Sequence, residues 1–178
     1  MTAMNIVLSR IKKRITPFTM LVVIVLTGIS ALWFFPASTI PAETEFRLLD
    51  GRKLSLQDLR GRPVLVNFWA TNCPPCIEEL PELMQLYREL HPRGLEIIGV
   101  SAAYDPPIVV QEFVQRRGIA YPVALDLDGK IARAFGGVAY VPTTYILASN
   151  GNVVLKYAGR LDVAKARRII AKYLKPAS

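Results

Sequence analysis

The chain has 178 residues, of which 52% are hydrophobic, and it carries a formal net charge of +8, two cysteines and one histidine. Two cysteines and one histidine cannot supply the four ligands of a structural zinc site. Half of the net charge comes from residues 10–14, which precede an apolar run, so this charge indicates membrane topology rather than nucleic-acid binding.

Residues 17–35 form an apolar run without a charged residue. A helix rises about 1.5 Å per residue, so the run just spans a hydrocarbon core of about 30 Å. It is longer than the usual signal-peptide core of about 7–15 residues. We therefore predict a cytoplasmic basic arm over 1–16, a transmembrane anchor over 17–35 and a linker over 36–45. A cleaved signal peptide remains the alternative.

The charges also predict the orientation of the chain. Basic residues lie before the apolar run, and the first acidic residue, Glu43, lies after it. Because positive charge stays on the cytoplasmic side, the globular part is predicted to lie outside the cytoplasmic membrane, in a periplasm-like space. Dithiols there face an oxidising environment, so a reduced pair would need an external electron supply.

Residues 46–178 are predicted to form one domain of alternating strands and helices. The pattern begins with a hairpin around Asp50-Gly51 and ends with a helix capped by Asp162. The strands predicted after the hairpin are 64–70, 95–101, 123–126, 143–147 and 153–158. The predicted helices are 76–90, 107–117, 130–135 and the last one, 163–174. This order predicts an α/β fold with a sheet covered by helices on both faces.

The motif Cys73-Pro74-Pro75-Cys76 follows an apolar strand, opens a helix and contains both cysteines of the chain. A strand that leads directly into Cys-x-x-Cys at a helix start is typical of a dithiol that switches to a disulfide. The unpaired N–H groups and the positive dipole end of a helix start favour a thiolate. We therefore expect Cys73 to be a solvent-facing nucleophile at the N-cap, and Cys76 to resolve the mixed disulfide.

Other functions fit the cysteine pair less well. A structural disulfide would close a very small loop and stabilise little, and covalent haem attachment needs a histidine where Ile77 stands. A peroxiredoxin would need proline at Val66 and threonine or serine at Ala70. Copper(I) binding by the reduced dithiol stays open as an alternative.

Residues 45–175 resemble the membrane-anchored TlpA/ResA-like thiol–disulfide oxidoreductases of the thioredoxin superfamily. The resemblance rests on residues 61–71, which lead into the Cys-x-x-Cys motif, and on residues 141–147. It implies a thioredoxin-like fold with a central mixed β-sheet flanked by helices. It also implies four substrate-binding residues: Trp69, Val141, Pro142 and Thr143.

Two further expectations come from this resemblance. A cis peptide bond precedes Pro142, and the Val141 backbone pairs with an incoming substrate strand. Glu79 matches a glutamate that family members carry three residues after the second cysteine. Because it shares a helix face with Cys76, the resemblance implies a catalytic role in moving protons to and from that thiol. A solvent-facing helix position is the alternative.

Three residues depart from the family's pattern. Asn67 replaces the buried aspartate of thioredoxins proper, so proton handling must differ. Asn72 replaces the tryptophan often found before the first cysteine, which removes apolar surface beside the nucleophile. Tyr140 stands where a glycine often precedes the cis-proline dipeptide, so the docking groove is expected to be narrower.

The sequence and the resemblance together predict a disulfide reductase in the bacterial cytoplasmic membrane, held by a single helix, with its catalytic domain in the periplasm. Family analogy suggests exported substrates with disulfides, such as apocytochrome c or copper-site cysteines, and a membrane dithiol protein as electron donor. No cofactor beyond the Cys73–Cys76 disulfide, no metal and no nucleic acid are expected. The alternatives are a disulfide oxidase that uses the same site and a copper(I)-binding or delivery protein.

Overall fold

The computed structural model describes residues 40–174 of the chain. The expected basic arm (1–16), the expected transmembrane anchor (17–35) and residues 36–39 of the expected linker lie outside the described residues. No helix within residues 40–174 combines the length and the apolar character that crossing a bilayer requires.

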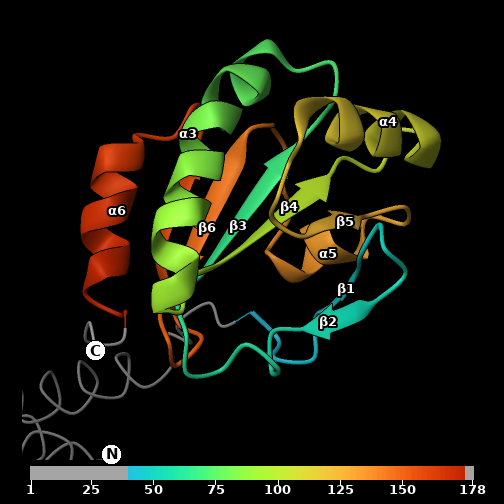
Figure 1. Cartoon of the computed structure of the whole chain (residues 1–178). Helices are drawn as coiled ribbons and strands as arrows, with labels where there is room; N and C mark the ends of the chain where they lie inside the picture. Colours follow the sequence, from blue (N-terminus) through green and yellow to red (C-terminus); the bar gives the residue numbers. More distant parts are fainter. Residues whose placement is uncertain (1–39, 175–178) are drawn as a thin grey trace, which may run out of the picture. The chain divides into compact units, whose positions relative to one another are not determined.

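The described part contains two sheets, four α-helices and one short 3-10 turn (Figure 1). The strands are β1 (Glu45–Arg47), β2 (Lys53–Ser55), β3 (Val64–Trp69), β4 (Glu96–Ser101), β5 (Val123–Leu125), β6 (Thr143–Leu147) and β7 (Val153–Ala158). The helices are α3 (Pro74–Leu90), α4 (Pro107–Arg117), α5 (Lys130–Ala134) and α6 (Val163–Ala171), and the 3-10 turn is η1 (His91–Arg93).

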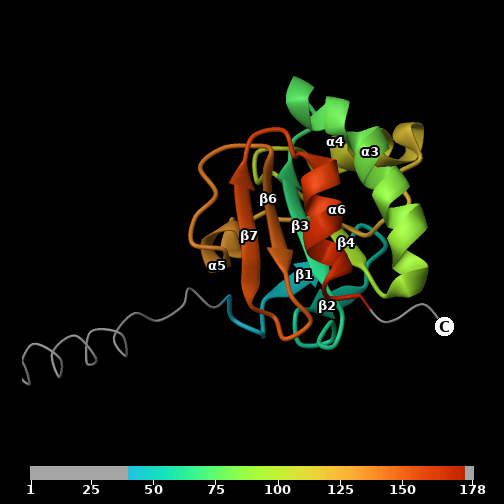
Figure 2. The same cartoon turned by 90° about the vertical axis from the view of Figure 1, so that its left-hand side faces the viewer.

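The main sheet has five strands in the order β5-β4-β3-β6-β7. Figure 2 shows β7, β6, β3 and β4 side by side in this order. Strand β3 is parallel to β4 and antiparallel to β6, while β4 and β5 are parallel and β6 and β7 antiparallel. The expected central mixed sheet is therefore confirmed. All six residues of β3 are buried, which explains its continuous apolar run, since both faces of this central strand are covered.

Helices cover both faces of this sheet, as expected. Alternate residues of β3 point to opposite sides. Leu65 and Trp69 belong to a core cluster that includes residues of α3, α4 and α6, whereas Val66 and Phe68 belong to a second cluster with residues of α5 and the β1–β2 hairpin. In Figure 1, α3 and α6 lie side by side over the sheet.

The N-terminal hairpin β1–β2 is a separate two-stranded antiparallel sheet, as the Asp50-Gly51 turn predicts. Chain segments before it also contact the domain. Ile40 is buried in the second core cluster, and Thr44 accepts a hydrogen bond from Leu56 N–H on its carbonyl oxygen (3.2 Å). Residues 40–45 therefore pack on the domain, although the sequence suggests a linker there.

Several element ends are fixed by single residues. Helix α4 ends at Gly118, whose φ of 62° suits glycine at a helix C-terminus. Helix α6 begins after Asp162, whose side chain accepts the Lys165 N–H (2.9 Å). Strand β5 ends one residue earlier than predicted, because Asp126 turns its carboxylate to the N–H groups of Ile131 and Ala132 in α5.

Candidate active site

The two cysteines lie where the central strand β3 passes into α3. They form a disulfide, with their Cα atoms 5.3 Å apart. Cys73 is the N-cap of α3, and its sulfur accepts the Cys76 N–H at 3.3 Å. Helix α3 starts at Pro74, two residues before the predicted start, because prolines at the first helical positions need no N–H partner.

The sulfur-bearing residues are less exposed than expected. Cys73 is 7% exposed and Cys76 is 1% exposed, and both belong to the apolar cluster between β3 and α3. The expectation that Cys73 faces solvent is therefore wrong for this oxidised state. Cys73 is still the more accessible of the two, and its N-cap position places its sulfur at the positive end of the helix dipole, which favours a thiolate after reduction.

A buried carboxylate holds the turn before Cys73. Asp105, in the β4–α4 loop, accepts the Thr71 N–H at 2.7 Å and the Thr71 hydroxyl at 3.1 Å. Asp105 is not among the site residues that the sequence predicts. Only its place after the strand next to β3 hints at it, because the carboxyl ends of parallel strands meet at one edge of a sheet.

The peptide bond between Val141 and Pro142 is cis, as the resemblance implies. In the β3–β6 pairing Phe68 lies opposite Thr143, so the Val141–Pro142 loop lies beside the segment that leads to Cys73. Val141 packs against the cluster that contains both cysteines. Its backbone N–H and C=O form no hydrogen bond with any residue in the described part of the chain, which leaves them available to a strand from a partner.

Three of the four expected substrate-binding residues are buried: Pro142 in the cis-proline loop, and Trp69 and Thr143 in the interior. Trp69 is 1% exposed and packs against Phe113, with ring centroids 5.3 Å apart. Thr143 is buried and donates its hydroxyl proton to the Tyr140 carbonyl oxygen at 2.7 Å. Neither side chain offers a surface to a substrate here, because both support the loop and strand ends from within. Tyr140, in contrast, is 75% exposed next to the cis-proline loop.

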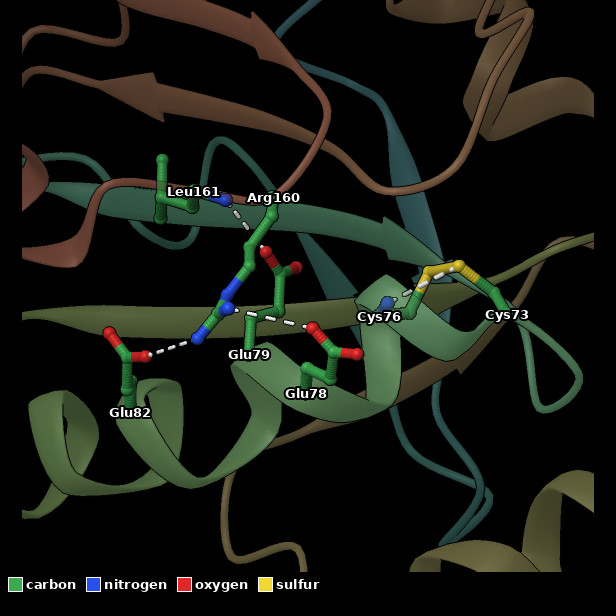
Figure 3. A network of polar contacts seen from close by, with 7 residues as sticks. All are labelled: Cys73, Cys76, Glu78, Glu79, Glu82, Arg160 and Leu161. Atoms are coloured by element: carbon green, nitrogen blue, oxygen red, sulfur yellow. Dashed lines mark hydrogen bonds and ion pairs between the residues drawn. A yellow bond between two sulfur atoms is a disulfide. The ribbon is translucent and has the colours of Figure 1, made fainter.

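Glu79 follows Cys76 on α3 and belongs to a buried polar network; Figure 3 shows its carboxyl group next to Leu161 and Arg160. It is 1% exposed, so the alternative of a solvent-facing helix residue is wrong. Asn67 Nδ2 donates to Glu79 Oε1 at 2.8 Å and to Thr144 Oγ1 at 3.0 Å. The Leu161 N–H donates to Glu79 Oε2 at 2.8 Å. Sequence reasoning singled out Glu79 and Asn67 but not Thr144 or the Leu161 N–H.

Burial raises the pKa of Glu79 above its usual value, because the interior disfavours a charged carboxylate. The hydrogen bonds from Leu161 and Asn67 and the positive charge of Arg160 oppose this rise in pKa, while the negative charge of Glu82 adds to it. The result is a carboxyl group whose proton is held more tightly than that of an exposed glutamate.

No three histidine, cysteine, aspartate or glutamate side chains within residues 40–174 gather as metal ligands would. The cysteine pair and Glu79 each bring chemistry to this site: the sulfurs can exchange disulfides, and the carboxyl group can exchange protons.

Comparison with known proteins places this site in a family. The AhpC/TSA family matches residues 34–156. The chain still lacks the peroxiredoxin pattern, because Val66 and Ala70 stand where that pattern needs proline and threonine or serine.

Curated relatives carry the name thiol–disulfide oxidoreductase ResA. The protein from Halalkalibacterium halodurans is 38% identical over 111 residues, which are 62% of this chain and 62% of that protein. The protein from Bacillus thuringiensis subsp. konkukian is 34% identical over 127 residues, 71% of this chain and 70% of that protein. The match to the first of these relatives thus spans a little under two thirds of its length.

A solved structure agrees with these relatives. A thiol:disulfide interchange protein of the thioredoxin family from Chlorobium tepidum is 30% identical and superposes with a TM-score of 0.68, over 76% of this chain and 96% of that one. The fold, the cysteine pair at the start of α3 and these matches together show that the chain belongs to the AhpC/TSA family and, within it, to the ResA-like thiol–disulfide oxidoreductases of thioredoxin-like fold.

Proposed function

We propose that this chain reduces disulfides in exported proteins through Cys73 and Cys76. The observation that carries the proposal is the asymmetry of the pair. Cys73 is the more exposed cysteine, at a helix start beside the unpaired backbone of Val141, and Cys76 lies deeper, three residues before the buried Glu79 on the same helix. This arrangement provides one sulfur for attack on a docked substrate and a second sulfur to complete the reaction.

The reaction proceeds in two exchanges. The Cys73 thiolate attacks a substrate disulfide, so a bond forms between Cys73 and one substrate sulfur while the other leaves as a thiolate and takes up a proton. The Cys76 thiolate then attacks Cys73, which forms the Cys73–Cys76 disulfide and releases the second substrate sulfur. The substrate gains two electrons, which the cysteine pair loses, and the two released substrate thiolates take up protons from the solvent.

Glu79 serves the second exchange. It is three residues after Cys76 on the same helix, within its first turns. A carboxylate there accepts the proton that Cys76 must lose before it can attack, and it returns the proton when the pair is reduced again. The raised pKa of Glu79, caused by its burial, suits a group that both takes and gives this proton.

The Val141–Pro142 loop docks the substrate. A free N–H and a free C=O at Val141 fit one extended residue of a substrate strand, added at the loop by main-chain hydrogen bonds. Such a contact recognises an extended polypeptide without reading its side chains, and it suits an enzyme that acts on several proteins.

The proposed location rests on the sequence. Residues 17–35 anchor the chain in the cytoplasmic membrane, the domain faces the periplasm, and a membrane dithiol protein reduces the cysteine pair. By analogy with the family, apocytochrome c before haem attachment or copper-site cysteines are the substrates. No cofactor other than the cysteine pair takes part.

The test is the reduction potential of the full-length chain in detergent, equilibrated with glutathione or dithiothreitol buffers and read by alkylation of free thiols. A value near the thioredoxin end of the range, roughly −270 mV, supports a reductase. A value near the oxidising end, roughly −120 mV, makes the chain a disulfide donor and overturns the proposed direction. Cys73→Ser is expected to abolish exchange, and Cys76→Ser to accumulate the mixed disulfide.

A further inference from the structure

One arginine in the β7–α6 loop contacts the cysteine-bearing helix on both sides of Glu79. Arg160 Nη1 lies 3.5 Å from Glu78 Oε2, and Arg160 Nη2 lies 3.0 Å from Glu82 Oε1. The next residue, Leu161, donates its N–H to Glu79. Figure 3 shows the guanidinium between the two outer carboxylates and the Leu161 N–H directed at the buried one.

The same loop also reaches the substrate-docking loop. Gly159 N–H donates to the Pro142 carbonyl oxygen at 2.7 Å. Three consecutive residues, 159–161, thus join the cis-proline loop, the surface of α3 and the buried carboxyl group of Glu79. A displacement of this loop would alter the docking loop and the surroundings of Glu79 together.

Two neighbouring carboxylates on α3 favour the observed position of Arg160. Glu78 and Glu82 are four residues apart on α3, where like charges repel. The guanidinium neutralises this repulsion and binds both carboxylates at once. Each of these exposed ion pairs is weak by itself. A planar guanidinium that binds two carboxylates at once can adopt fewer conformations than one that binds a single carboxylate, so the two pairs together restrict the Arg160 side chain.

The groups around Glu79 come from several elements. Its surroundings include Asn67 of β3, Arg160 and the Leu161 N–H of the β7–α6 loop, Tyr121 before β5, and Glu82 of its own helix, on which Cys76 lies three residues earlier. Two of the three influences that lower the pKa of Glu79 come from the β7–α6 loop: the Leu161 N–H and the Arg160 charge. Both depend on where that loop lies.

We propose that Arg160 is a positioning residue that, by bridging Glu78 and Glu82, keeps the Leu161 N–H on the Glu79 carboxylate and so controls the proton that Glu79 exchanges with Cys76. The inference rests on the proposed function for its role in catalysis. In the resolving step the proton leaves the Cys76 thiol for Glu79, the Cys73–Cys76 bond forms, and the substrate sulfur departs. Arg160 touches none of the reacting atoms and acts through Leu161 and Glu79.

The experiment compares Arg160→Gln with Arg167→Gln in the full-length chain in detergent. Arg167 is the matched control, because it also joins the C-terminal part of the domain to α3, through an ion pair with Glu89 in the last turn of that helix. Two readouts need no substrate. One is the NMR titration of the Glu79 carboxyl carbon, assigned by its loss in Glu79→Gln, and the other is the hydrogen exchange of the Leu161 amide.

In Arg160→Gln the titration of Glu79 is expected to move to higher pH, because the loss of a nearby positive charge and of a well-held N–H donor both disfavour the carboxylate. The Leu161 amide is expected to exchange roughly twofold to fivefold faster. The pH profile of disulfide exchange should move in the same direction as the titration. Arg167→Gln should change none of the three.

The proposal is overturned if the Glu79 titration and the Leu161 exchange rate in Arg160→Gln coincide with those in Arg167→Gln. It is also overturned if Arg160→Gln shifts the pH profile of exchange equally in a Glu79→Gln background, because Arg160 would then act without Glu79. Failure of the proposed function looks different: the wild-type chain would exchange with no disulfide, while the titration and the amide exchange would still decide the role of Arg160.

Discussion

At the scale of single residues, the amide of Asn67 explains how a carboxyl group can lie behind the cysteines. It donates to Glu79 Oε1 and to Thr144 Oγ1, while the Leu161 N–H donates to Glu79 Oε2, so both carboxyl oxygens have a partner in the interior. An aspartate at this position would lie within hydrogen-bond distance of a second carboxyl group, and one of the two would have to stay protonated. The buried carboxyl group behind the cysteines therefore belongs to Glu79 of α3, and the residue at position 67 serves it as a hydrogen-bond donor.

Glu79→Gln is expected to change how stability depends on pH. The pKa of Glu79 is raised from 4.5 in the folded chain, mainly by burial. The folded state then binds more protons than the unfolded state between pH 4.5 and the folded pKa, so the contribution of Glu79 to stability is full below this window and is lost as the pH rises through it.

The measurement is urea unfolding of the oxidised chain, wild type and Glu79→Gln, across that window. The free energy of unfolding of the wild type, minus that of the variant, should fall as the pH rises. Using the oxidised chain removes the thiols from the titration, because both cysteines are in the disulfide. A difference that stays constant or rises with pH would contradict the raised pKa.

At the scale of elements, the start of α3 is held by its neighbours as much as by its own sequence. The β4–α4 loop provides Asp105 for the turn at Thr71, and the β7–α6 loop provides the Leu161 N–H for Glu79. Each of these loops follows a strand of the main sheet. The position of the cysteine pair therefore depends on two loops, distant in the sequence, that meet the start of α3 at one edge of the sheet.

Asp105→Ala is expected to destabilise the chain by about 1–3 kcal/mol, because it removes the acceptor of two hydrogen bonds and leaves the Thr71 N–H without its partner. The reduced Cys73 should also react more slowly with a model disulfide, since the turn before it is no longer held. Denaturant unfolding and stopped-flow exchange measure the two effects.

Asp128→Ala is the control: that carboxylate is exposed and pairs with Lys130, so its loss should change stability by less than about 0.5 kcal/mol. Equal effects of the two substitutions would show that Asp105 does not hold the turn at Thr71.

Gly99 of β4 lets two aromatic rings pack over the strand. A Cβ atom at this position would lie 3.0 Å from Trp69 Nε1 and 3.1 Å from Tyr121 Cε2. Gly99→Ala is therefore expected to cost about 1–3 kcal/mol of stability, as other forms of overpacking do. In a double-mutant cycle, the cost should be smaller in a Trp69→Phe background, whose shorter ring leaves room for the methyl group. A cost that is unchanged in that background would show that Trp69 is not the obstacle.

The sequence predicts the elements better than the contacts between them. The bounds of α4, β6 and β7 agree with the prediction, because their apolar spacing, the glycine after α4 and the turn at 149–151 are local signals. The site itself depends on distant partners. Glu79 meets the Leu161 N–H 82 residues away, and Thr71 meets Asp105 34 residues away. A backbone N–H leaves no mark in the sequence, and a lone aspartate in a loop resembles any solvated acid.

At the scale of the whole molecule, the distribution of charge and the position of the cysteines together predict on which side of the membrane the active site lies. The basic arm at residues 10–14, the apolar run at 17–35 and a domain that contains both cysteines predict that the thiols lie on the far side of the membrane from the arm. Because Cys73 and Cys76 are the only cysteines of the chain, any thiol label on the protein reports the position of the active site.

A membrane-impermeant maleimide should therefore label the reduced chain in intact cells whose outer membrane has been made permeable. Cys73 should take the label first, because it is the more exposed of the two. Cys73→Ser should lower the labelling rate severalfold, and the double variant without cysteines should take no label. Labelling that requires disruption of the cytoplasmic membrane would place the domain in the cytoplasm. A reducing compartment would then keep the dithiol reduced without a membrane electron donor, and the role of the anchor proposed for residues 17–35 would have to be abandoned.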